Sequence, residues 1–153
     1  MKPTATVIKI VLLLVVLGCN LSCALKAIPS NYTASRLPTI DMESLGNGTI
    51  LIYNGADILH GMDNTARLNI WIGEKSMGQI RKKEYTILQL EKGTYDFNVL
   101  HIDMFNMRSK HSVEIDENTK VIRIEPTVTS NKLTVTNELP TNFAKYTHVL
   151  DRK

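Results

Sequence analysis

The sequence predicts an all-β protein that folds as an antiparallel β-sandwich of about 7–8 short strands, in an immunoglobulin- or prealbumin-like arrangement. Short apolar runs of period two recur from Thr49 onward, about 8–12 residues apart, with polar turn residues between them. Inside the domain, no uninterrupted helical stripe is longer than ten residues, so a βαβ fold is not expected. The length of 153 residues suits one domain, and two cysteines exclude a disulfide scaffold or a cysteine-rich zinc module.

The first residues predict export. Lys2 and Lys9 flank a polar start, the apolar run 10–17 follows, and small or polar residues occupy 18–24. This order is typical of a secretory signal, so residues 1–23 are interpreted as a signal peptide with a lipobox. The uncharged run 10–25 has 16 residues, shorter than the roughly 20 of a spanning helix. An uncleaved anchor, with Lys9 extended to the interface, is the alternative.

Cys19 is the predicted site of lipid attachment. Val16-Leu17-Gly18-Cys19 resembles a bacterial lipobox, and a multiply acylated cysteine anchors a chain stably. Cleavage after Ala24, which would release a soluble domain, is the alternative. Removing the residues before Cys19 leaves 16 of the 18 basic residues against 15 acidic ones. This balance indicates no nucleic-acid partner.

Three segments are expected beyond the signal. Residues 24–46 carry few large apolar groups and are predicted to form a flexible tether with a span of about 25 Å. Residues 47–138 form the sandwich, and 139–153 form a C-terminal tail. A short helix is expected over residues 142–150, and it would pack back on the sandwich. Alternatively, this helix would bind a partner. The apolar side of that helix would carry Phe143, Tyr146 and Leu150.

Two aromatic residues in the first half of the sandwich, Tyr53 and Trp71, are candidates for an interaction patch. Strands are expected over residues 49–53, 67–72, 77–80 and 85–90. Trp71 alternates with Ile70 and Ile72, and Tyr53 alternates with Ile52. Because a sandwich buries one face of each strand, Tyr53 and Trp71 could face outward and form a patch that binds a protein partner. Coverage of both residues by a loop or by the C-terminal segment is the preferred interpretation.

The second half of the sandwich holds the predicted strands 95–99, 112–115, 121–125 and 133–135. The alternation slips at residues 100–102, which suggests a bulge, and residues 103–110 look irregular. His101 and Asp103 share one strand face and could supply two metal ligands. Because no third ligand is indicated, solvated polar side chains are the preferred interpretation, and we predict no metal site and no cofactor.

The sequence carries no catalytic signature. It holds no Gly-x-Ser-x-Gly, no His-Glu-x-x-His and no Gly-Lys-Ser/Thr, and no cysteine follows Cys23. We therefore predict a non-enzymatic protein without catalytic residues. Two short basic clusters, residues 81–83 and 108–111, either contact anionic lipid head groups near the anchor or form solvated loops that discourage edge pairing.

Three motifs support a family resemblance. They are the strand 50–53 that ends in an aromatic, the strand–turn–strand unit 68–80, and the Leu-x-x-Gly-x-aromatic turn 90–95. Over residues 50–125 the chain resembles an uncharacterised family of bacterial lipoprotein domains and the related PEGA-type sandwich modules. It departs from them at Asn54, where an arginine is frequent, and lacks the Pro-Glu-Gly-Ala signature. The resemblance implies a non-enzymatic envelope module, with no functional residues to carry over.

These observations predict a lipid-anchored β-sandwich in the bacterial envelope, at the outer membrane or the periplasmic face. It would be a binding or structural module. Its lipid would anchor it to the membrane, and its surface would bind a protein partner. One alternative is an accessory subunit of an envelope or secretion assembly. The other is a secreted soluble ligand-binding domain or enzyme.

Overall fold

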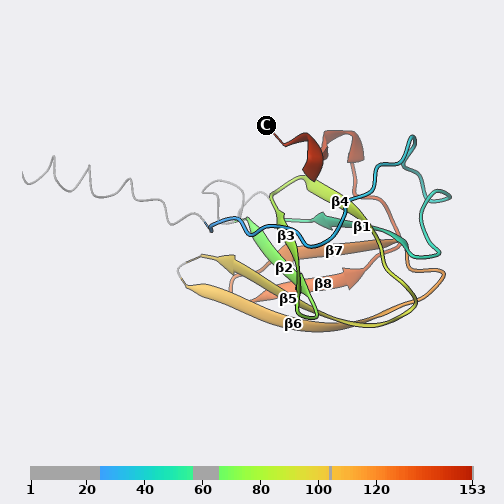
Figure 1. Cartoon of the computed structure of the whole chain (residues 1–153). Coiled ribbons are helices and arrows are strands. Elements are labelled where there is room, and N and C mark those ends of the chain that lie inside the picture. Colours follow the sequence, from blue (N-terminus) through green and yellow to red (C-terminus); the bar gives the residue numbers. More distant parts are fainter. Residues whose placement is uncertain (1–24, 57–65, 104, 153) are drawn as a thin grey trace, which may run out of the picture.

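A computed structural model describes residues 25–56, 66–103 and 105–152, and Figure 1 shows two β-sheets packed face to face. The predicted sandwich is therefore confirmed. The described residues form nine strands: β1 (Thr49–Asn54), β2 (Leu68–Ile72), β3 (Lys75–Ile80), β4 (Glu84–Gln89), β5 (Gly93–Ile102), β6 (Asn106–Ile115), β7 (Val121–Pro126), β8 (Asn131–Val135) and β9 (Thr147–His148).

The two sheets differ in their strand directions. The five-stranded sheet has the order β8-β7-β1-β4-β9, and the four-stranded sheet has the order β3-β2-β5-β6. The four-stranded sheet is antiparallel throughout, as predicted. In the five-stranded sheet, however, β1 runs parallel to β7, and β4 runs parallel to β9. Parallel neighbours need long connections, which local turn signals do not reveal.

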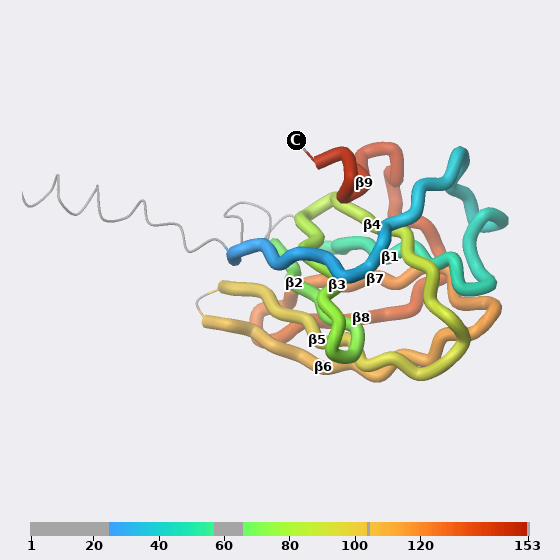
Figure 2. The backbone as a smooth tube through the Cα atoms, viewed as in Figure 1, coloured from blue at the N-terminus to red at the C-terminus, as the bar shows by residue number. Residues whose placement is uncertain are grey.

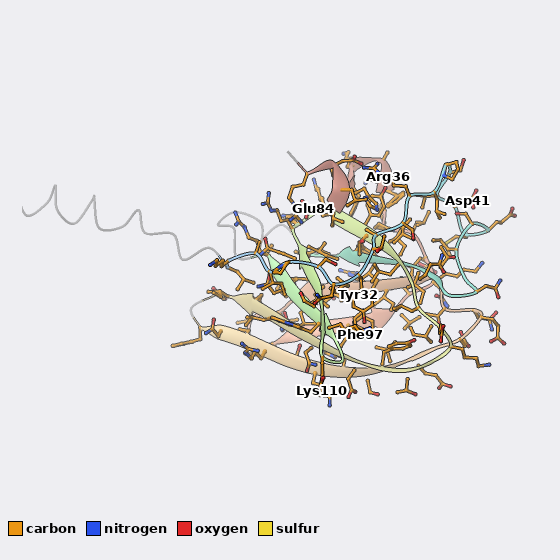
Figure 3. The ribbon with its side chains drawn as sticks, in the orientation of Figure 1. Tyr32, Arg36, Asp41, Glu84, Phe97 and Lys110 are labelled. Atoms are coloured by element: carbon orange, nitrogen blue, oxygen red, sulfur yellow. The ribbon has the colours of Figure 1, made fainter. Side chains whose placement is uncertain are left out.

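The main hydrophobic core lies between the sheets. The period-two alternation directs Ile50 and Ile52 of β1 toward Ile70 and Ile72 of β2. Phe97 of β5 is fully buried among them, and Figure 3 shows it between the sheets. Full burial of each such side chain stabilises the fold by about 1.5–3 kcal/mol, so this alternation determines which face of each strand turns inward.

A second core covers the outer face of the five-stranded sheet. Leu51 and Tyr53 of β1 point to this side with Ile87 of β4 and Val121 of β7. Residues from both ends of the described chain pack over them. The covering residues are Leu37, Ile40, Met42 and Leu45 from the N-terminal side and Leu139, Phe143 and Tyr146 from the C-terminal side.

Residues 25–46 are not the flexible tether that the sequence predicts. Figure 2 shows this segment running past β3 and on over β4. The Asn31 N–H donates to the Ser76 carbonyl at 2.8 Å, and the Ser35 N–H donates to the Ile87 carbonyl at 2.8 Å. The segment has few apolar residues, but several of them pack on the sandwich. Its backbone N–H groups also bind carbonyl groups at the edges of β3 and β4, which would otherwise be unpaired. Tyr32 even packs against the main core.

The C-terminal segment forms two single-turn 3-10 helices, η2 (Phe143–Lys145) and η3 (Val149–Asp151), on either side of β9, instead of one short helix. It packs back on the sandwich, as expected for Phe143 and Tyr146, whereas Leu150 is exposed. Beyond η3, Arg152 donates to both carboxylate oxygens of buried Glu84, at 2.9 and 2.5 Å. This paired geometry fixes the segment to the start of β4.

His148 joins the two covering segments. Its Nε2 lies 3.1 Å from the Ser35 carbonyl oxygen, and its Nδ1 accepts from the Leu150 N–H at 3.2 Å. These two bonds suit the neutral ring that carries its proton on Nε2. Burial lowers the pKa of His148, and the hydrogen bond to the Ser35 carbonyl partly opposes this; smaller effects come from Arg36, which lowers the pKa, and from Asp151, which raises it. A protonated Nδ1 would lose the bond from Leu150.

The β5–β6 hairpin differs from prediction. Its ladder is unbroken from Gly93↔Ile115 to Ile102↔Asn106, so residues 100–102 hold no bulge and residues 106–110 are regular strand. The alternation looked broken because a histidine, His101, occupies an inward position and is fully buried. A register shift occurs instead between β2 and β3, beside Trp71.

Candidate functional site

The outer face of the four-stranded sheet carries a row of three side chains that the sheet register aligns. Trp71 of β2 lies opposite Asn98 of β5, and Asn98 lies opposite Lys110 of β6. Directly opposite residues on neighbouring strands have Cβ atoms about 4.5–5.5 Å apart, so the row spans three strands. Figure 3 shows Lys110 on the side of the sheet away from Phe97. We call these three residues the Trp71 row.

A shallow hollow of about 530 Å³ lies over the row. Its lining combines an aromatic ring, an amide, two cations, a hydroxyl and one carboxylate; the ring and the cations bind apolar and acidic groups. Its lining residues are Trp71, Gly73, Glu74, Asn98, Val99, Arg108, Ser109 and Lys110.

The charges beside Trp71 are unevenly compensated. Lys110 Nζ lies 2.8 Å from the Asp96 carboxylate, and both side chains remain largely exposed. The Arg108 guanidinium lies 6.0 Å from the Trp71 ring centroid, where a cation and an aromatic face attract each other. Among the residues that the structure describes, Arg108 contacts this ring and forms no ion pair with a carboxylate. Arg108 is therefore the cation that an acidic group of a ligand would meet in the hollow, beside Glu74, which also lines it.

Tyr53 and Trp71 do not form one patch. Tyr53 points to the outer face of the five-stranded sheet, whereas Trp71 points to the outer face of the four-stranded sheet. Tyr53 is only 5% exposed, and its ring meets the Tyr146 ring edge-on at a centroid distance of 5.7 Å. Burial raises the pKa of Tyr53. The C-terminal segment thus covers Tyr53, which matches the preferred interpretation, while Trp71 stays partly exposed.

His101 is a buried link between the sheets. Its Nδ1 lies 2.8 Å from Asn131 Oδ1, and the Asn131 amide donates to the Val99 and Met107 carbonyls at 3.3 and 3.1 Å. The preferred interpretation of His101 as a solvated side chain is therefore wrong. Among residues 25–56, 66–103 and 105–152, no group of three or more His, Cys, Asp or Glu side chains could hold a metal ion.

The predicted lipid site, Cys19, and the predicted signal segment lie outside the described residues. Within the described ranges, no helix has the length and hydropathy to cross a membrane.

Sequence reasoning found Trp71 and the basic cluster 108–111, but it did not place Asn98, Arg108 and Lys110 beside Trp71. The signal was present, because polar residues occupy the even positions of 94–98 and of 108–114. Treating 103–110 as irregular hid the register that aligns these positions with Trp71.

Comparison with protein-family models, curated protein sequences and solved structures finds no significant match. The functional argument therefore rests on the sequence and on the geometry of the described residues.

Proposed function

We propose that the protein is a membrane-anchored, non-enzymatic binding module of the bacterial envelope that holds an acidic protein partner on the Trp71 row. The observation that carries this proposal is an asymmetry. The outer face of the five-stranded sheet lies under two chain segments, whereas the middle of the other outer face leaves Trp71 partly open with Arg108 beside it.

The chemistry of the row fits a protein partner. Tryptophan and arginine are the residues that most often dominate the free energy of protein–protein binding. An apolar side chain of the partner would cover the Trp71 ring, and a carboxylate would meet Arg108 and Lys110. Asn98, between these groups, would donate or accept hydrogen bonds across the centre of the contact.

The anchor part of the proposal rests on the sequence before residue 25. Its first test is the intact mass of the mature protein from its native membrane fraction. A chain that begins at Cys19 and carries added acyl mass supports the anchor. A chain that begins at Leu25 without lipid contradicts it and leaves a secreted soluble domain.

The binding part is tested by photo-crosslinking in the full chain. We would place a benzophenone amino acid at position 71 and, as a control, at Leu150, which is 54% exposed near the other sheet. We expect a discrete crosslinked partner from position 71 alone. Purified partner should then bind the Trp71→Ala protein at least about thirtyfold more weakly, the loss expected for a hot spot of about 2 kcal/mol.

A charge test completes the design. Arg108→Glu should abolish the crosslink at position 71, and an acid-to-lysine exchange on the partner should restore it. Equal crosslinking from positions 71 and 150, or unchanged affinity in Trp71→Ala, would contradict binding on the row.

A further inference from the structure

One end of the sandwich gathers several features that the Trp71 row does not use. Asn131, at the start of β8, bonds to residues of both strands of the β5–β6 hairpin. The β7–β8 turn therefore lies beside the hairpin tip. Ile80, the last residue of β3, pairs with Leu68, the first residue of β2, so the turn 81–83 leaves the same end. We call this the hairpin end.

Two large apolar side chains protrude there. Phe105 at the β5–β6 tip is 70% exposed, and Val128 in the β7–β8 turn is 71% exposed. Both belong to tight turns: the Asp103 N–H donates to the Phe105 carbonyl, and the Thr127 N–H donates to the Ser130 carbonyl. Folding buries neither side chain, although each would gain from leaving water.

The first described residues, Leu25 and Lys26, also contact the sandwich at the hairpin end. The Asn69 amide, one residue into β2, donates to the Lys26 carbonyl, and the Gln79 amide, one residue before the end of β3, donates to the Leu25 carbonyl. Figure 1 shows this first described segment beside the tip of the β5–β6 hairpin. The apolar run of residues 10–17 lies only eight positions before Leu25 in the sequence.

The charge differs between the two ends. The hairpin end carries Lys26 and the basic turn Arg81-Lys82-Lys83, with Asp103 as an acidic neighbour. The other two carboxylates there are paired, Glu84 with Arg152 and Glu125 with Arg123 and Lys132. The turns at the opposite end carry Glu74, Glu91, Asp116 and Glu117 together with Lys75, Lys92 and Lys120.

From this arrangement we propose that the hairpin end docks on an anionic membrane surface, with Phe105 and Val128 in the interfacial layer and Lys82 and Lys83 at the phosphates. The proposal rests on the anchor in the proposed function, because that anchor delivers the chain to the membrane at Leu25. Apolar insertion and basic attraction are the two standard components of such docking. The opposite end, about 30 Å away along ten-residue strands, then faces the aqueous phase.

The test places an environment-sensitive fluorescent amino acid at position 105, 128 or 118 of the full chain in phosphatidylcholine vesicles, with and without phosphatidylglycerol. Vesicles with brominated lipids report contact with the bilayer. We expect a blue shift and quenching at positions 105 and 128 when phosphatidylglycerol is present. At position 118, in the turn of the opposite end, we expect neither.

Charge variants separate docking from anchoring. Lys82→Gln with Lys83→Gln should lower the docked-to-free ratio, read from quenching at position 105, by about thirtyfold. The matched pair Lys75→Gln with Lys92→Gln should leave that ratio unchanged. Sedimentation with vesicles of phosphatidylcholine alone, on which no docking is expected, reports the anchor independently. A chain that sediments while positions 105 and 128 stay unquenched in the presence of phosphatidylglycerol overturns the docking proposal alone, and a chain that does not sediment overturns the anchor and docking together.

Discussion

Replacing Trp71 by alanine distinguishes a binding residue from a structural one. Trp71 lies on an outer sheet face, so water can fill the space that the ring leaves, and no cavity forms. The variant loses the contacts with Arg108 and with the opposite strand, each worth up to about 1 kcal/mol. We expect the free energy of unfolding to fall by about 1–2 kcal/mol in total.

Phe97→Ala supplies the structural reference. Phe97 is fully buried between the sheets, where truncation leaves a cavity that its neighbours fill poorly. Such changes cost about 3–5 kcal/mol. Phe97→Leu gives a milder reference where the alanine variant does not fold.

The free energies of unfolding of both variants are measured by urea titration. Unfolding is monitored by far-UV circular dichroism, because this signal does not depend on the tryptophan that one variant lacks. If Trp71→Ala destabilises as much as Phe97→Ala, the Trp71 ring is part of the core, and the argument for a binding row fails. A small loss of stability together with a large loss of partner affinity supports it.

Three further predictions concern the covering segments and one turn. Arg152→Met removes the bidentate partner of the buried Glu84 carboxylate and should lower the free energy of unfolding by about 2–3 kcal/mol. As a control, Arg36→Ala removes an exposed ion pair with Asp151 and should leave the urea midpoint unchanged. Because folding lowers the pKa of His148, its contribution to stability is full above pH 6.5 and is lost as the pH falls toward the folded-state pKa. His148→Gln should flatten that part of the pH profile of thermal unfolding. Gly48→Ala should cost about 2 kcal/mol in urea unfolding, because φ is +87° and the new Cβ would lie 2.7 Å from a carbonyl oxygen.

The sandwich could be predicted because burial acts on every second residue. Strands such as β2 and β7 place apolar side chains on one face, and that pattern survives any arrangement of neighbours. The parallel pairing of β1 with β7 was not predictable, since it depends on where chain segments far apart in sequence meet.

The covering segments escaped prediction for a related reason. Residues 25–46 have the composition of a tether, and their order comes from edges and faces that only the folded sandwich offers. The same holds for His101, whose partner Asn131 lies 30 residues away. Trp71 was identified from its parity, but its neighbours required the β5–β6 register.

The two proposed surfaces would support each other. The strand register places Asn98, in the Trp71 row, four residues from the end of β5, about 14 Å from the hairpin end. A domain docked by that end would hold its strands steeply to the bilayer and present the row sideways, close to the membrane. A partner embedded in the same membrane would then meet the row at a high effective concentration, so moderate affinity would suffice. Charge removal at Lys82 and Lys83 should therefore weaken partner capture on vesicles while leaving the affinity measured without membranes unchanged, a result that an isolated binding face would not produce.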